Sequence, residues 1–90
     1  MYKIKYHKRV LKVLKGQPRN IRVKIIETLE LLKQNPFDQS KLDIKPLKGF
    51  DNMFRLRIGK FRVLFEIRKT ELLIYVIAIG SRGEIYKKLP

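Results

Sequence analysis

The 90-residue chain contains no cysteine, no tryptophan, a single histidine and only eight acidic residues. Without cysteine, neither a disulfide bond nor a thiolate metal site can form, which fits a reducing cytoplasm. The lone histidine, His7, excludes a ribonuclease site built on a histidine pair and is expected to be an ordinary surface residue. The acidic residues form no cluster at metal-ligand spacing, so a two-metal nuclease site is not expected either.

Long apolar runs and glycine-rich loops are also missing. No run approaches the ~18 apolar residues needed to cross a bilayer, and the first ten residues, MYKIKYHKRV, lack the apolar core of a signal peptide. No glycine-rich loop precedes a helix, so a phosphate-binding P-loop is absent. We therefore expect one domain over residues 1–90, located in the cytoplasm, with no cofactor and no metal.

Positive charge is abundant. The 22 lysines and arginines against eight acids give a formal net charge of +14 and a pI near 10.4. Such an imbalance opposes compaction of the isolated chain and favours a polyanionic partner. Nucleic acid, an anionic membrane surface and an acidic protein would all satisfy it, and nucleic acid is the favoured interpretation.

The first third of the chain predicts one strand and two helices. Residues 2–6 (YKIKY) alternate with period two, which is typical of a strand. Apolar residues at helical spacing predict a short helix over residues 7–15, with Gly16 suited to its C′ position. Pro18 fits the first turn of a second helix that runs to Gln34, before Asn35-Pro36. The short link predicts an antiparallel helical pair.

The segment Met53–Ile67 predicts a β-hairpin with Gly59-Lys60 as a type II′ turn, because glycine takes a positive φ without cost. Its apolar side chains then share one face; they are Phe54, Leu56, Ile58, Phe61, Val63, Phe65 and Ile67. The other face carries arginines, with Arg57 directly opposite Arg62 and Arg55 opposite Leu64. Two opposed arginines repel each other, which indicates that this face meets an anion.

The remaining segments complete the predicted sheet. Residues 37–46 are interpreted as a polar connection and residues 68–71 as a loop, while residues 72–79 (LLIYVIAI) predict a strand buried on both faces. With Ile67 opposite Leu72, Ile77 would lie beside Arg62. Residues 85–89 are expected to form a short strand or a frayed tail. The result is an α+β fold, a small, mostly antiparallel sheet made from one strand and a three-stranded meander, with the helical pair on one face.

Five side chains can supply chemistry on the other face. Arg82 follows the last core strand, close to the Gly59-Lys60 end of the hairpin, and Tyr86 lies four residues further on. Guanidinium groups bind phosphate oxygens and stabilise the charge of a pentacovalent transition state, and RNA supplies its own 2′-hydroxyl nucleophile. The set consists of Arg55, Arg57, Arg62, Arg82 and Tyr86. The alternative is a solvated basic face with Tyr86 as packing at its rim.

The run LKGFDNMFRLRIGKFRVLFEI, followed by VIAIGSRGEIY, resembles the RelE/ParE toxin superfamily on its RelE-like side. The first strand, the helical pair and the NPF connection agree with that family as well, so the resemblance covers nearly the whole chain. It implies the toxin of a type II toxin–antitoxin pair, which cleaves mRNA in the ribosomal A site by metal-independent 2′-hydroxyl attack. A RelB-like antitoxin would wrap the toxin, and mRNA and 16S rRNA would be its other partners.

The resemblance also assigns roles by motif position. Arg55 and Arg57 occupy the two basic strand positions, Arg62 would hold the scissile phosphate and Arg82 would stabilise the transition state and leaving group. Tyr86 would stack on the nucleotide. Some relatives have lysine in place of Arg57, where it is a candidate general base, whereas arginine hardly deprotonates. Two alternatives remain open, namely a ParE-like inhibitor of DNA gyrase and a non-catalytic RNA-binding homologue.

Overall fold

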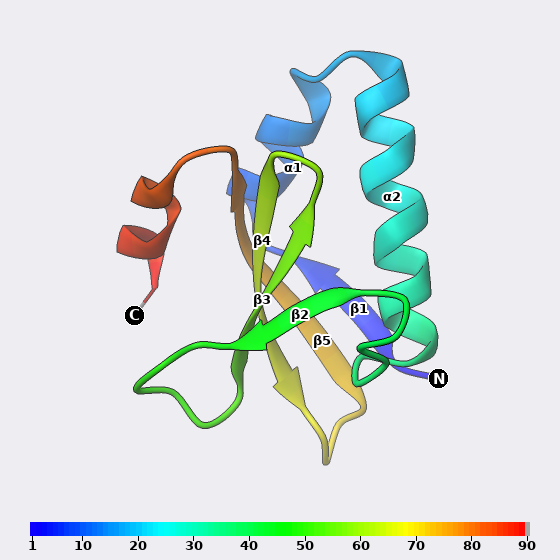
Figure 1. The fold of residues 1–90 in the computed structure, drawn as a ribbon, viewed down its shortest axis with the longest axis vertical. Helices are drawn as coiled ribbons and strands as arrows, with labels where there is room; N and C mark the ends of the chain where they lie inside the picture. Colours follow the sequence, from blue (N-terminus) through cyan, green and yellow to red (C-terminus); the bar gives the residue numbers. More distant parts are fainter. Residues whose placement is uncertain (90) are drawn as a thin grey trace.

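The computed structural model describes residues 1–89, which form a single sheet flanked by helices (Figure 1). In chain order the elements are β1 (Lys3–Tyr6), α1 (Lys8–Lys15), α2 (Arg19–Gln34), β2 (Asp43–Pro46), β3 (Met53–Ile58), β4 (Phe61–Arg68), β5 (Leu73–Gly80) and the 3₁₀ helix η1 (Gly83–Lys88). The strand order is β1-β5-β4-β3-β2. Only the β1–β5 pair is parallel among these strands, so the predicted α+β fold with a mostly antiparallel sheet is confirmed.

The two helices begin and end close to their predicted limits. Pro18 is the N-cap of α2, and Asn35 ends that helix in an extended conformation, as expected for a residue before proline. Gly16 ends α1, but its φ of −83° is right-handed, so it does not use the left-handed freedom for which a C′ glycine is chosen. The chain reverses between α1 and α2, giving the predicted antiparallel pair (Figure 1).

Both helices cover the same face of the sheet. The core between them consists of buried apolar side chains from every layer, including Val10 and Leu14 of α1, Ile25, Leu29 and Leu32 of α2, and Leu56, Val63, Phe65, Ile74 and Val76 of the sheet. Among the side chains that the structure describes, no charged or polar residue is buried. The apolar face predicted for the hairpin therefore lies against α1 and α2, and the arginine face points away from them.

The prediction of a polar connection over residues 37–46 is wrong at its end, where β2 forms an edge strand. Ile44 is buried and pairs with Leu56, while its charged neighbours Asp43 and Lys45 lie on the opposite face. One apolar residue between two charged ones is too short a pattern to identify alone. The free edge of β3 supplies the hydrogen-bonding partner that makes it a strand.

The predicted pairing of β5 with β4 is also wrong. Ile67 pairs with Ile74 rather than Leu72, because residues 69–72 form the turn and β5 begins at Leu73. Leu72 has a φ of 50°, which a bulky side chain rarely adopts. Apolar character alone assigned this residue to the strand, but the backbone uses it to close the turn.

A bulge moves the register by one further residue in the middle of β5. The irregularity lies at Leu64/Phe65, which pair with Ala78 and Val76, so Ile77 is the additional residue. Gly80, not Ile77, therefore lies beside Arg62.

The second face of the sheet has a smaller apolar cluster of its own. Met53, Leu64, Ile77, Ala78 and Ile85 are buried there, with Ile85 contributed by η1. The C-terminal segment is thus a 3₁₀ helix rather than the expected strand or frayed tail. It lies on the opposite side of the hairpin from α2 (red end of the chain, Figure 1).

Candidate functional site

The turn between β3 and β4 sets the geometry of the candidate site. Gly59 has a φ of 57° and Lys60 is not among the residues with positive φ, which matches a type II′ turn. Arg57 pairs with Arg62 and Ile58 with Phe61, as predicted from the sequence. Cross-strand neighbours have Cβ atoms about 4.5–5.5 Å apart, so the two arginine side chains leave the sheet side by side.

Arg55 is held more tightly than its neighbours. Its side chain is only 14% exposed, and its Nη2 donates to Oδ1 of Asp43 at 3.0 Å. The buried Nε of Arg55 has no hydrogen-bond partner among the described residues. Arg57, by contrast, is exposed and donates from Nε to the carbonyl oxygen of Gly59 at 3.3 Å. Of the two basic residues of β3, Arg55 is therefore fixed by Asp43 and Arg57 is accessible to a ligand.

β5 and η1 bring the two C-terminal residues of the set to the same face. Arg62 pairs with Gly80, and exposed Arg82 lies two residues beyond, as the N-cap of η1. A Cβ atom on Gly80 would lie 2.4 Å from Cγ2 of Ile85. Only glycine allows this close approach, which seats η1 on the sheet.

Tyr86 is anchored by its ring. It is partly buried and packs against the apolar cluster that contains Leu64. Leu64 is opposite Arg55 on the same face and two residues from Arg62. All five predicted side chains therefore come from neighbouring positions of one face and from η1 at its border. Arginine forks beside an aromatic ring are suited to holding a phosphate and an adjacent base.

Asp43 is a site residue that the sequence reasoning missed. It pairs directly with Arg57 across the β2–β3 ladder and binds Arg55. The signal that could have found it is the alternation Asp43-Ile44-Lys45, in which a buried residue separates two charged residues of the opposite face. It brings a carboxylate into a surface otherwise formed by arginines.

No group of three or more potential metal ligands occurs in the described part of the chain. His7 lies at the start of α1, on the β1 side of the sheet, where Nδ1 accepts a hydrogen bond from the backbone N–H of Arg9 at 3.1 Å. Partial burial lowers the pKa of His7, and the charges of Arg9 and Lys8 lower it further. His7 caps a helix and is not part of the arginine face.

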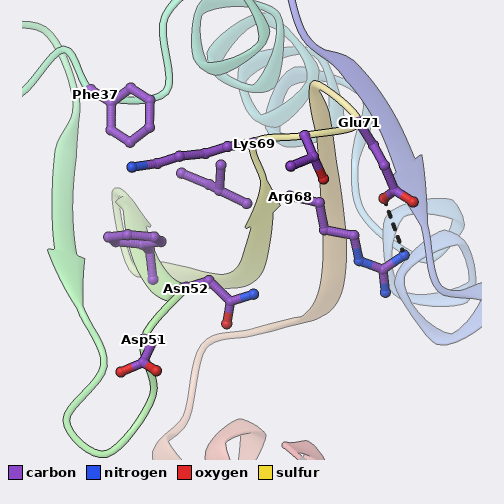
Figure 2. A pocket seen from close by; sticks show the side chains of 9 residues that line it. Phe37, Asp51, Asn52, Arg68, Lys69 and Glu71 are labelled. Carbon is purple, nitrogen blue, oxygen red and sulfur yellow. Dashed lines mark ion pairs between the residues drawn. The ribbon is translucent and has the colours of Figure 1, made fainter.

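A hollow lies at the opposite end of the hairpin from Gly59. It has a volume of about 640 Å³ and is lined by residues from the β2–β3 loop, β3, the end of β4, the β4–β5 turn and the segment after α2, among them Phe37, Asn52, Phe54 and Ile67. Figure 2 shows Lys69 extending toward Phe37, whose ring centroid lies 5.4 Å from Nζ. Arg68 turns aside to pair with Glu71 at 3.8 Å. None of the five predicted site residues lines this hollow.

Within residues 1–89 no helix is long and apolar enough to cross a membrane.

Comparisons with known proteins agree with this fold. A family model described as the ParE toxin of type II toxin–antitoxin systems matches residues 4–86. The putative toxin RelE1 of Methanocaldococcus jannaschii is 43% identical over 86 residues, which cover 96% of each chain. Toxin RelE3 of the same organism is 32% identical over 89 residues, covering 98% of this chain and 99% of the relative.

A solved structure gives the same result. The archaeal RelE–RelB complex from Pyrococcus horikoshii OT3 contains a chain that superimposes with a TM-score of 0.80 at 27% identity, over 91% of this chain and 96% of that one. The protein is thus a toxin of the RelE/ParE superfamily of type II toxin–antitoxin systems. Within this superfamily the chain belongs with the RelE toxins.

Proposed function

We propose that this toxin is a ribosome-dependent endoribonuclease that cleaves mRNA in the A site without a metal ion. The observation that carries the proposal is the direct pairing of Arg57 with Arg62, with Gly80 beside Arg62 and Arg82 just beyond it. Such a cluster of like charges costs stability in the free protein. A phosphodiester between these guanidinium groups removes that cost.

The chemistry follows from what the arginines can and cannot do. Arg62 holds the non-bridging oxygens of the scissile phosphate, and Arg82 stabilises the negative charge that grows in the pentacovalent transition state and on the leaving oxygen. Arg55 and Arg57 add to the field, and Tyr86 stacks on the neighbouring nucleotide. The adjacent 2′-hydroxyl of the RNA attacks in line, so correct positioning provides much of the rate enhancement.

The openness of the arginine face supports a requirement for the ribosome. Arg57 and Arg82 are exposed, and the 640 Å³ hollow is formed by other residues. A site of this kind binds the RNA backbone but encloses little of it, so a second body must hold the message in the cleavable conformation. In the proposed function, the mRNA codon and 16S rRNA of the A site do this.

The test uses Arg62→Ala and Arg82→Ala, with Arg19→Ala as the control, since Arg19 is an exposed arginine at the start of α2. Primer extension on a translated message after induction reports the position and extent of cleavage. Each site variant should cut at least about hundredfold more slowly, the usual scale for losing transition-state charge stabilisation, and should relieve growth arrest. Arg19→Ala should cut like the wild type. Full cleavage by the Arg62/Arg82 double variant, with an unchanged melting temperature, would exclude the proposed site.

A ParE-like inhibitor of DNA gyrase is the second candidate, and the match to the ParE family model favours it. A gyrase inhibitor acts by binding and needs no catalytic set. Supercoiling assays with purified gyrase discriminate the two functions, since inhibition of gyrase while translated mRNA stays intact would establish the ParE-like activity.

A non-catalytic RNA-binding homologue is the third candidate, and the net charge of +14 is the observation behind it. Such a protein would bind RNA with an affinity that falls steeply as salt rises, yet leave ribosome-bound mRNA uncut.

The antitoxin is proposed to be a RelB-like protein, because relatives of this chain have been solved as RelE–RelB complexes. A neutral to acidic segment with an amphipathic helix would suit this toxin. α2 leaves Val23 and Ile26 more than 40% exposed. A separate, mainly apolar hollow of about 250 Å³ lies between Ile21 and Ile25 of α2 and the Gly59 turn. An antitoxin whose toxin-binding segment carried net positive charge would contradict this part of the proposal.

A further inference from the structure

Attack by a 2′-hydroxyl requires a group that accepts its proton, and the five predicted site residues do not obviously include one. Four of them are arginines, which stay protonated, and the fifth is a tyrosine, whose phenol donates at neutral pH. The five residues can therefore position the phosphate and stabilise its negative charge, but none of them is suited to accept the proton of the 2′-hydroxyl. The missing group is expected among residues that the chain brings to the same face from elsewhere.

β2 brings such a group. Asp43 of β2 pairs directly with Arg57 of β3. Directly paired side chains lie on the same face of a sheet, so the Asp43 side chain neighbours that of exposed Arg57. Its side chain is 52% exposed and thus open to a ligand. Oδ1 accepts the hydrogen bond from Arg55, which fixes the carboxylate and leaves the lone pairs of Oδ2 available.

The other acids whose side chains the structure describes are engaged or lie elsewhere. Glu66 accepts from Arg68 at 2.6 Å and from Asn52 at 3.2 Å, and Glu71 pairs with Arg68. Asp38 binds Ser40 in the loop before β2, and the two glutamates of α2 belong to the far side of the sheet. Asp51 lines the hollow at the opposite end of the hairpin. Asp43 alone among them adjoins the arginine pair.

We propose that Asp43 is the general base of the cleavage reaction, an inference that rests on the proposed ribonuclease function. Its carboxylate takes the proton of the 2′-hydroxyl as the O2′–P bond forms. The P–O5′ bond breaks, and the leaving 5′-oxygen takes a proton from water while Arg82 stabilises its charge. The products are a 2′,3′-cyclic phosphate end and a 5′-hydroxyl end, and Asp43 returns its proton to solvent.

The surrounding charges are consistent with this role. Arg55 and Arg57 of β3 face the carboxylate, and Lys45 follows it on the same side of β2. When RNA binds, the phosphate contacts exposed Arg57, while Arg55 keeps Oδ1 in place and leaves Oδ2 to face the 2′-hydroxyl beside that phosphate.

The experiment measures single-turnover cleavage on programmed ribosomes for the wild type, Asp43→Asn and Glu66→Gln. Glu66→Gln is the matched control, since it also removes a carboxylate that binds an arginine. Asp43→Asn should lower the cleavage rate about hundredfold or more, the scale of general-base catalysis, with ribosome binding unchanged. Glu66→Gln should cleave like the wild type.

The pH profile and a double variant separate a base from a residue that only holds Arg55. The wild-type rate should be nearly flat around neutral pH, whereas the Asp43→Asn rate should rise about tenfold per pH unit as hydroxide takes over. Asp43→Asn should also slow an Arg55→Met protein, where the ion pair is already gone. Unchanged cleavage in that background, or a wild-type rate that itself rises tenfold per unit, would overturn the assignment. Failure of the wild type to cleave would overturn the proposed function and this step with it.

Discussion

At the scale of single residues, the candidate site depends on two glycines as much as on its arginines. Gly59 closes the hairpin with a positive φ and so sets Arg57 against Arg62. Gly80 has ordinary backbone angles, and its role is steric, because Ile85 occupies the space that a side chain would fill. Replacing either glycine would therefore displace the arginine side chains of the site without altering their chemistry.

We expect Gly80→Ala to be a severe change for so small a substitution. The added Cβ would lie 2.4 Å from Cγ2 of Ile85, so η1 must shift and carry Tyr86 with it. Overpacking of this kind costs about 1–3 kcal/mol of unfolding free energy. The cleavage rate of the folded variant should fall as well, because Tyr86 is displaced. Thermal unfolding and cleavage assays measure both effects.

Gly83→Ala is the matched control, since a Cβ there would meet nothing within 4 Å. It should change the free energy of unfolding by less than about 0.5 kcal/mol. Equal behaviour of the two alanine variants would show that η1 is not seated through Gly80.

At the scale of elements, the sequence predicts what local pattern and turn chemistry decide. The hairpin register came out correctly because one glycine turn fixes the pairing of all six residues of β3 with β4. The ends of α2 were predictable from Pro18 and Asn35-Pro36. Arg55, Arg57 and Arg62 all lie on strands that were predicted.

The elements that failed are those decided by a neighbour in space. β2 exists because β3 offers it an edge, so Asp43 could not be assigned to the arginine face from its own segment. The register of β5 depends on a turn that uses Leu72 at positive φ and on a bulge at Ile77. Neither feature has a local signature, since leucine and isoleucine are ordinary strand residues.

The start of α1 predicts a pH effect on stability. His7 caps the helix by accepting from Arg9 N, and its pKa is lowered by burial and by neighbouring cations. The folded protein therefore binds this proton less readily than the unfolded chain, so stability falls as pH drops below about 6.5. His7→Asn keeps a good N-cap but cannot titrate. Its melting temperature should fall less than that of the wild type between about pH 7 and pH 5. Parallel melting curves would contradict the role given to His7.

At the scale of the whole molecule, the fold is compact although it is heavily charged. Its radius of gyration is 12.1 Å, close to the roughly 12 Å expected for a chain of this length. The side chains that the structure describes form four ion pairs, all with partly or largely exposed partners, and such pairs contribute little. Repulsion within a net charge of +14 therefore remains largely uncompensated in the free toxin.

That repulsion should make the free protein more stable in salt. Raising NaCl from about 0.05 to about 0.5 M shortens the screening length about threefold, to roughly 4 Å. This weakens the repulsion among surface cations. The melting temperature should rise over this range. Replacing exposed Lys41 and Lys48 with glutamate lowers the net charge by two units each, so the rise should be smaller in that variant. A melting temperature that fell with salt would mean that local ion pairs outweigh the net charge. An acidic antitoxin would then have to stabilise the toxin through apolar contacts alone. If repulsion among the toxin's cations dominates instead, the negative charge of the antitoxin both stabilises the toxin fold and covers the arginine face.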